Sequence, residues 1–278
     1  MGKRFIRSLL TLCLPLMLVG CSHLFYHPTR YIYVDPKKLT PPPEQVEIPF
    51  RDGKIVAWYF KPIDREPKAN ILFFHGNAQN ISSHFFSLFW IIKEGYGFLI
   101  FDYPGYGGSS GEPTPESTTA SGDQALQWLL ASHPKTPVAI FGQSLGGNIA
   151  LYTAAKHKQS ICLVTVESTF KSYKKVAQRT LAKNPITWAL QPLGYLLVSD
   201  KYSAGDHIAE ISPTPLMVIH SQTDRVVTFE NGEDVFNAAK APKEFLQLPD
   251  GEHIQAFTGP QNSVHRKKFL AALEVCHR

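Results

Sequence analysis

Two short stretches of this chain have the pattern G-x-S-x-G, which can present a serine hydroxyl as a nucleophile. They are GQSLG at residues 142–146 and GGSSG at residues 107–111. Ser144 follows an apolar run, VAIFG, and precedes LGGNIALYTAAKH, which is typical of a helix. This strand–turn–helix context is the one in which the motif exposes a reactive serine. Ser109 lies among turn residues that run into prolines. We therefore predict that Ser144 is the nucleophile and that Ser109 belongs to a loop.

A serine hydroxyl needs a base to take its proton, and the base needs an acid that orients it. With this motif the three residues follow one another in the order serine, acid, histidine. His253 lies in a Gly-Glu-His turn just past the apolar run EFLQL, so we predict that it is the base. Asp224, after the run PLMVIH, is the predicted acid, and Glu167 at the end of ICLVTVE is the alternative. Asp102 also ends an apolar run, but it precedes the serine and breaks this order.

Attack on a carbonyl creates a negatively charged oxygen, which requires hydrogen-bond donors. One donor is expected at the backbone N–H of Leu145, directly after the serine. The other is expected at the backbone N–H of Asn77, in the loop FFHGNAQN. His75 in the same loop is expected to order that loop rather than act as the base. Solvent exposure is expected for the histidines in or near helix ends, His133, His157, His265 and His277.

The composition is that of a single α/β domain. The 278 residues are 44% hydrophobic and 18% charged, which is enough for a large core. The net charge is +5, but Lys3, Arg4 and Arg7 supply part of it, and the rest of the chain is nearly neutral. Nucleic-acid binding is therefore not expected. Because no ligand spacing typical of a metal site occurs, neither a metal nor a cofactor is expected.

The first twenty residues have the features of a secretion signal that ends in a lipidation site. A basic start precedes the apolar stretch 8–19, which is shorter than a typical membrane span. Residues 18–21, LVGC, then resemble a bacterial lipobox. We predict cleavage before Cys21 and lipidation of its thiol; an ordinary secretion signal is the alternative. Ser22 favours the outer membrane of a bacterial cell envelope, with the protein facing the periplasm.

Residues 21–43 are interpreted as the lipidated cysteine and a tether, which is polar and aromatic and ends in three prolines. Fully extended, about twenty residues reach roughly 70 Å, so the domain could stand clear of a lipid surface. The alternative is that part of this segment packs on the domain, because it contains apolar side chains, namely Tyr26, Tyr31, Ile32 and Tyr33.

Four cysteines occur in the sequence. Cys13 belongs to the signal and Cys21 is the predicted lipidation site, which leaves Cys162 and Cys276. We do not interpret two cysteines as a disulfide framework, so the fold is expected to rest on its hydrophobic core alone.

After residue 43 the hydrophobic pattern alternates between strands and helices. QVEIPF and KIVAWYF predict a hairpin, and six further strands are predicted at ANILFFH, GFLIFD, VAIFG, ICLVTVE, PLMVIH and EFLQL. Helices are expected at 81–94, 116–133, 145–157, 228–240 and 261–275. This alternation predicts a mostly parallel eight-stranded sheet with helices on both faces. Residues 168–213 predict a small helical cap over the carboxyl ends of the strands. The alternative is a long crossover whose aromatic residues belong to the core.

Six motifs follow one another in an order that resembles the α/β-hydrolase superfamily: HGNAQN, FDYPGYGGSSGEP, GQSLGG, VESTF, HSQTDRVV and GEH. The resemblance covers about residues 45–276 and is greatest to serine aminopeptidase-like and acyl-hydrolase proteins. It implies the α/β-hydrolase fold over residues 44–278. One departure is Ser221, where glycine is common. The resemblance also implies the roles assigned above: Ser144 as nucleophile, Asp224 as acid, His253 as base, and Asn77 and Leu145 as oxyanion donors.

Together these features predict a serine hydrolase that cleaves a carboxylic ester or thioester through an acyl-enzyme. The expected substrate is a small-molecule acyl ester, a thioester or a lipid-like molecule, because an aromatic cap and a membrane anchor suit a hydrophobic acyl chain. A peptidase of the same fold is one alternative. A non-catalytic, membrane-anchored binding protein is another, and the complete serine, acid and histidine set argues against it. The sequence favours no particular oligomeric state.

Overall fold

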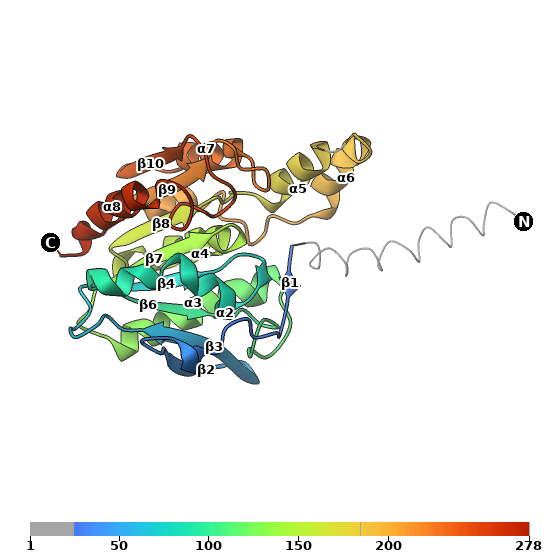
Figure 1. Cartoon of the computed structure of the whole chain (residues 1–278). Helices are drawn as coiled ribbons and strands as arrows, with labels where there is room; N and C mark the ends of the chain where they lie inside the picture. The colour runs from blue at the N-terminus through green and yellow to red at the C-terminus, as the bar shows by residue number, and fades with distance from the viewer. Residues whose placement is uncertain (1–24, 184, 278) are drawn as a thin grey trace, which may run out of the picture.

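A computed structural model describes residues 25–183 and 185–277 of the chain. Eight strands form one sheet in the order β10-β9-β8-β7-β4-β6-β3-β2 (Figure 1). β2 is antiparallel to β3 and β3 to β6, whereas the other pairs are parallel. The predicted mostly parallel eight-stranded sheet is therefore confirmed. Its strands are β2 (Glu44–Phe50), β3 (Gly53–Phe60), β4 (Asn70–Phe74), β6 (Gly97–Phe101), β7 (Val138–Gln143), β8 (Leu163–Glu167), β9 (Leu216–Ser221) and β10 (Lys243–Leu248).

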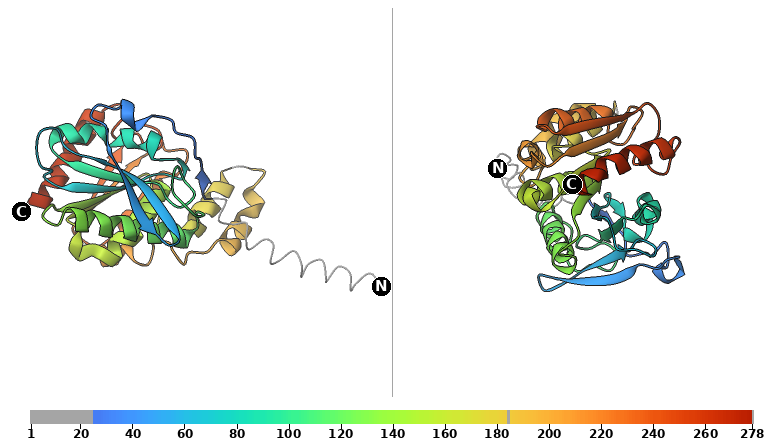
Figure 2. Two further views of the ribbon diagram at one scale, coloured as in Figure 1. Left: turned by 90° about the horizontal axis from the view of Figure 1, so that it is seen from below. Right: turned by 90° about the vertical axis from the view of Figure 1, so that its left-hand side faces the viewer.

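Helices cover both faces of the sheet (Figure 2). Each face has its own hydrophobic core. Leu126 of α3, Ile149 of α4 and Val235 of α7 belong to one core. Ile81 of α2 and Phe269 of α8 belong to the other. These helices are α2 (Ile81–His84), α3 (Pro115–Ser132), α4 (Leu145–His157), α7 (Phe229–Ala238) and α8 (Asn262–Leu273).

The single helix predicted over residues 81–94 is wrong. α2 is followed there by two 3-10 helices, η3 (Phe85–Ser87) and η4 (Phe89–Glu94). In a 3-10 helix, residues three apart lie above one another. This geometry lets Phe85, Leu88 and Ile91 face the sheet together, and all three are fully buried.

Much of the predicted tether packs on the domain instead of standing clear of it. β1 (His27–Pro28) pairs with β5 (Ala78–Gln79) in a separate parallel ribbon. Tyr26 is buried, and its hydroxyl lies 3.3 Å from the hydroxyls of both Thr118 and Tyr173. The alternative given above is therefore correct for Tyr26 and the β1 ribbon, whereas Tyr31, Ile32 and Tyr33, which it also named, remain exposed. The signal and Cys21 lie outside the described residues.

A disulfide joins Cys162 and Cys276, contrary to the interpretation that the fold rests on its core alone. Cys162 directly precedes β8, and Cys276 lies in the final 3-10 helix, η8 (Glu274–His277). The two residues are 114 positions apart in the chain, and their Cα atoms lie 5.1 Å apart. Sequence spacing alone could not show that these two ends meet.

The segment 168–213 forms a small helical cap. α5 (Tyr173–Ala182) and α6 (Gln191–Leu197) project from the body at the end where β1 lies (Figures 1 and 2). Phe170 and Tyr173 belong to the core, as the alternative interpretation expected, whereas Trp188 and Tyr195 are exposed. The described residues also contain the short 3-10 helices η2 (Pro36–Lys38), η5 (Lys158–Ser160), η6 (Trp188–Leu190) and η7 (Ile208–Ile211). Within the described ranges, no helix has both the length and the apolar character required to cross a bilayer.

Candidate active site

The chain turns sharply between β7 and α4, and Ser144 occupies the corner. Its φ of 53° and ψ of −121° lie in a region that side chains other than glycine rarely adopt. The flanking glycines permit this turn. A Cβ atom on Gly146 would lie 2.3 Å from the carbonyl oxygens of Phe74 and His75, and one on Gly142 would lie 2.7 Å from Ala150 Cβ. The predicted strand–turn–helix context of Ser144 is present.

Three side chains from distant parts of the sequence form a continuous hydrogen-bonded line. Ser144 Oγ lies 2.9 Å from His253 Nε2, and His253 Nδ1 lies 2.8 Å from Asp224 Oδ2. Asp224 follows β9, and His253 lies in the loop after β10. With Nδ1–H donating to the carboxylate, Nε2 can accept the serine proton. The structure thus brings together the three residues that the sequence singled out.

The environment of Asp224 stabilises its ionised form. Oδ1 accepts hydrogen bonds from the backbone N–H groups of Val226 (2.8 Å) and Val227 (3.0 Å). Burial alone would raise the pKa of Asp224, but the hydrogen bond and charge of His253 and the N–H of Val226 together hold the pKa below its usual range. A fixed carboxylate of this kind can orient an imidazole and stabilise its protonated form.

His220 is a neighbour of this carboxylate that the sequence analysis missed. It is fully buried at the end of β9, and its Nε2–H donates to the carbonyl of Val227, 2.8 Å away. Its Nε2 also lies 3.5 Å from Asp224 Oδ2. Burial lowers the pKa of His220, which favours the neutral ring. The ring therefore helps to fix the loop that carries Asp224, and its position four residues before Asp224 was the only available signal.

Glu167, the alternative acid, has a different set of partners. Its carboxylate accepts hydrogen bonds from Gln143 Nε2 and from the backbone N–H of Ala256, each at 2.7 Å. Burial raises the pKa of Glu167. It therefore ties the end of β7 to the loop that carries His253, and it makes no hydrogen bond to that imidazole.

The two expected oxyanion donors both line the pocket in front of Ser144. Leu145 is the first residue of α4, so its N–H precedes the first intrahelical hydrogen bond and remains available to a ligand. Asn77 lies in the loop after β4, where its carbonyl accepts hydrogen bonds from His27 N (3.0 Å) and the Tyr106 hydroxyl (2.6 Å). The N-terminal segment thus supports the loop that carries Asn77.

Two histidines stack beneath this loop. His75 is fully buried, and its Nδ1–H donates to the carbonyl of Gly76 at 2.8 Å, as expected for a residue that orders the loop. His84, which the sequence analysis did not consider, has its ring centroid 5.2 Å from that of His75. A Cβ on Gly76 would lie 3.3 Å from His84 Cε1 and 3.8 Å from Ser144 Cβ, so His84 borders the site. Burial lowers the pKa of both rings.

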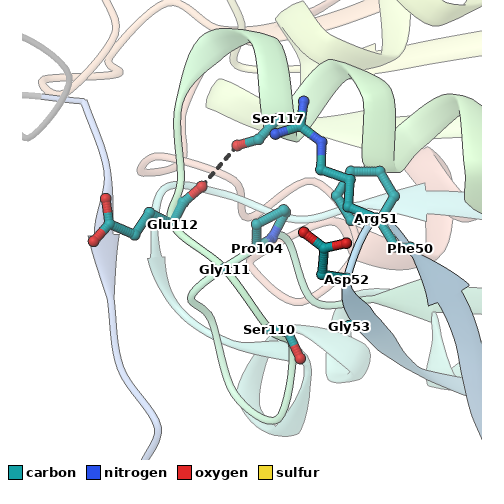
Figure 3. Close-up of a pocket in the computed structure, with 9 residues that line it drawn as sticks. All are labelled: Phe50, Arg51, Asp52, Gly53, Pro104, Ser110, Gly111, Glu112 and Ser117. Atoms are coloured by element: carbon teal, nitrogen blue, oxygen red, sulfur yellow. Dashed lines mark hydrogen bonds between the residues drawn. The ribbon is translucent and has the colours of Figure 1, made fainter.

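Ser109, in the second G-x-S-x-G stretch, has a structural role. Its buried hydroxyl donates to the carbonyl of Asp102 (2.7 Å) and accepts from the N–H of Val56 (2.9 Å). The loop around it lines a separate cavity of about 220 Å³ together with the β2–β3 turn (Figure 3). Asp52 and Ser110 belong to the lining of that cavity, and Ser144, Asp224 and His253 do not.

Of the four histidines expected to face solvent, His277 is exposed, His133 and His157 are half-buried, and the expectation for His265 is wrong. His265 is buried, not solvent-facing, and its Nδ1–H donates to the carbonyl of Ala256, 3.0 Å away. The reason is that α8 packs this residue against the loop that carries His253. Among the described residues, no group of three or more His, Cys, Asp or Glu side chains is arranged to hold a metal ion.

A pocket of about 270 Å³ opens directly onto Ser144. The body contributes Phe25, Asn77, Leu145, Val226 and Val227, and the cap segment contributes Phe170 and residues of α5 and α6. No charged residue belongs to this described lining, which consists of Phe25, Asn77, Ser144, Leu145, Phe170, Val176, Ala177, Thr180, Leu181, Gly194, Val226 and Val227.

Sequence comparisons agree with this architecture. A family profile described as "alpha/beta hydrolase fold" matches residues 69–188. Protein YfhR of Escherichia coli O157:H7 is 31% identical over 274 residues, which cover 96% of this chain and 92% of YfhR. Protein bem46 of Schizosaccharomyces pombe is 26% identical and covers 86% of this chain and 80% of its own length.

Solved structures share the fold. The esterase Pf2001 of Pyrococcus furiosus superposes with a TM-score of 0.71 at 20% identity, over 90% of this chain and 97% of the esterase. An acylaminoacyl peptidase of Pyrococcus horikoshii gives a TM-score of 0.66 at 17% identity, over 84% of this chain and 41% of the peptidase. With this sheet, this strand–turn–helix corner and these relatives, the chain belongs to the alpha/beta hydrolase family.

Proposed function

We propose that this protein is a serine hydrolase that cleaves carboxylic esters or thioesters through an acyl-enzyme. The observation that carries the proposal is the unbroken hydrogen-bonded line from Ser144 Oγ to His253 and on to Asp224. In this proposal Ser144 is the nucleophile, His253 the general base and Asp224 the acid that orients it. The strained backbone of Ser144 supports this assignment, because residues with strained backbone conformations cluster at active sites.

The proposed reaction has two halves. His253 Nε2 takes the hydroxyl proton as Ser144 Oγ attacks the carbonyl carbon, and the N–H groups of Asn77 and Leu145 stabilise the resulting oxyanion. The protonated imidazole then gives its proton to the leaving alcohol or thiol, and the acyl group stays on Ser144. In the second half His253 activates a water molecule, which releases the acid and restores the serine.

The pocket favours a hydrophobic acyl group as the substrate's acid portion. Its lining is dominated by apolar side chains, with Asn77, Ser144 and Thr180 as the polar members. A peptidase that binds a charged peptide terminus would need a charged partner in its pocket, and the described lining supplies none. We therefore prefer an acyl ester, thioester or lipid-like substrate to a peptide.

Labelling with a fluorophosphonate probe tests the nucleophile. Wild-type protein should become labelled, and Ser144→Ala should not, while both remain folded. Hydrolysis of p-nitrophenyl esters of graded acyl length, measured beside aminoacyl nitroanilides, then separates esterase from peptidase activity. Equal labelling of wild type and Ser144→Ala would contradict the assignment, and folded wild-type protein that stays unlabelled would favour a binding protein.

We also propose that the protein is anchored by lipid on Cys21 in a bacterial cell envelope, at the outer membrane facing the periplasm. The Cys162–Cys276 disulfide supports an oxidising compartment, since such bonds persist in secreted and periplasmic proteins. Metabolic labelling with radioactive palmitate tests this proposal. The label should enter the wild type and be absent from Cys21→Ser; equal incorporation would refute lipidation at this residue.

A further inference from the structure

The cap carries exposed apolar side chains within one short segment. Five of them, which we call the cap surface, lie between residues 188 and 197: Trp188, Leu190, Tyr195, Leu196 and Leu197. Each is between 39% and 75% exposed. A gathering of large apolar side chains in solvent marks a binding surface, whereas single exposed ones do not.

Basic groups border the cap surface. The ammonium of Lys174 lies 5.0 Å from the ring centroid of Tyr195, and Lys201 is exposed just past α6. Of the other basic residues of the cap, Lys175 and Arg179 pair with Asp234, and Lys183 donates to the carbonyls of Arg225 and Val226, so the border of the cap surface consists of Lys174 and Lys201. An apolar centre with a basic rim fits the surface of an anionic phospholipid bilayer, where apolar side chains enter the acyl region and ammonium groups reach the headgroups.

The path of the chain places this cap close to the proposed anchor. Phe25, where the described chain begins, packs edge-on against Tyr173 at the start of α5, with ring centroids 5.1 Å apart. Phe25 and Gly194 of α6 line the same pocket. Cys21 lies only four residues before Phe25, a span of at most about 14 Å. Because the following residues pack on the domain, no long tether separates the cap from a lipid on Cys21.

We propose that the cap surface docks into the phospholipid bilayer that holds the lipid on Cys21, so that the pocket receives its acyl substrate from that bilayer. The proposal rests on the lipidation and hydrolase activity proposed above. α6 links the two roles, since Gly194 lines the pocket while the next three residues, Tyr195 to Leu197, are exposed. The bilayer-facing helix is thus also a wall of the acyl pocket.

Environment-sensitive fluorophores test the docking directly. The full lipidated chain is reconstituted on vesicles of phosphatidylglycerol and phosphatidylcholine, with the fluorophore at Leu196→Cys. The matched control carries it at Lys135→Cys, an exposed site before β7 and therefore at the opposite edge of the sheet from Ser144. The probe at 196 should shift to the blue and be quenched by nitroxides on the lipid acyl chains, and the probe at 135 should do neither.

Two results would overturn the docking. The probe at 196 could remain as aqueous as the probe at 135, which leaves the cap surface in solvent. It could also shift to the blue without acyl-chain quenching, which means that protein, such as a second copy of the chain, covers the surface.

A second measurement separates docking from catalysis. The double variant Trp188→Ser, Leu196→Ser should hydrolyse a bilayer-embedded ester at least about tenfold more slowly, a change of about 1.4 kcal/mol, because two large apolar side chains no longer enter the bilayer. Its hydrolysis of a soluble short-chain p-nitrophenyl ester should be unchanged. Equal losses on both esters contradict docking. If wild type cleaves neither ester, the proposed function fails, and the fluorophore result still decides the docking.

Discussion

Among single residues, the polar groups around Ser144 are of two kinds: those that form the hydrogen-bonded line with Ser144, and those that hold the surrounding loops in place. Asp224 and Glu167 show the division most clearly, because both are buried carboxyl groups near His253, Glu167 at the end of β8 and Asp224 in the loop after β9. Only Asp224 contacts the imidazole, at 2.8 Å, whereas Glu167 joins Gln143 to the backbone of Ala256. The same chemical group therefore serves two purposes within one small region.

Amide substitutions at these two carboxyl groups should have very different effects on turnover. Asp224→Asn removes the charge that holds the correct His253 tautomer, so kcat/KM on a soluble ester should fall about 10³- to 10⁴-fold. Glu167→Gln keeps an oxygen that can accept from Ala256 N–H, so kcat/KM should stay within about tenfold of wild type, a change of about 1.4 kcal/mol. Steady-state kinetics on both purified variants checks this. If Glu167→Gln lowers kcat/KM more than Asp224→Asn does, then Glu167 and not Asp224 is the acid that orients His253.

Ser109 offers a parallel test of the second G-x-S-x-G stretch. Ser109→Ala leaves the buried N–H of Val56 and the carbonyl of Asp102 without their hydroxyl partner. Unfolding in urea should show a loss of about 1–3 kcal/mol in the free energy of unfolding. Fluorophosphonate labelling of the folded variant should persist. Loss of labelling in a folded Ser109→Ala protein would contradict its structural role.

These residues also show how far sequence reasoning reaches. Ser144, Asp224 and His253 could be singled out because motif context and chain order constrain them. His220 and His84 could not, since their importance lies in contacts that only the folded chain creates, with Asp224 and beside Ser144. His265 was misjudged for the same reason, because helix-end position does not reveal what packs over a side chain.

At the scale of elements, the strands followed their sequence patterns closely, whereas short connecting segments did not. Buried strands of a parallel sheet read as continuous apolar runs, which makes them easy to locate. Residues 81–94 also contain many apolar side chains, but packing against the sheet selected 3-10 turns over a regular helix. The elements around this segment meet at Asp102, just past β6, whose carboxylate accepts from the N–H of Ile81 at the start of α2, 3.0 Å away.

Asp102 should make the stability of this junction depend on pH. Burial raises the pKa of Asp102 to about 7, whereas an unfolded aspartate titrates near pH 4. Between these values the folded chain binds the proton that the unfolded chain releases, so this contribution to stability is present at low pH and is lost as pH rises through about 7. The loss per pH unit is at most about 1.4 kcal/mol.

Comparison with Asp102→Asn isolates this effect from other titrating groups, among them Glu167, whose pKa burial also raises. The free energy of unfolding of wild type minus that of the variant, measured in urea between pH 4 and 8, should decrease as pH rises to about 7 and then level off. A difference that stays constant or increases over this range would show that Asp102 is ionised throughout.

At the scale of the whole molecule, both ends of the chain are tied to the domain in ways that local sequence patterns did not predict. The N-terminal segment pairs its β1 with β5, and His27 N–H contacts the carbonyl of Asn77 beside the site. The C-terminal helix is joined through Cys276 to Cys162 at the start of β8. Composition alone cannot reveal such attachments, because they depend on two distant segments meeting in space.

The disulfide should stabilise the whole fold without affecting the chemistry. It closes a loop with a sequence separation of 114 residues, for which the chain-entropy argument gives roughly 5 kcal/mol, and disulfides typically stabilise a fold by about 2–4 kcal/mol. The variant Cys162→Ser, Cys276→Ser should therefore unfold at lower urea concentration than wild type. Dithiothreitol should lower the stability of wild type to the same level and leave the variant unchanged.

Ester hydrolysis by folded protein, at urea concentrations below the unfolding transition, should be equal in wild type and variant. The reason is that Cys162 lies at the start of β8, whereas the N–H of Ser144 bonds to the carbonyl of Glu167 at the other end of that strand. A variant as stable as wild type would mean that the core and sheet alone hold the C-terminal helix in place. A variant that is folded but inactive would mean that loss of the disulfide changes the geometry around Ser144.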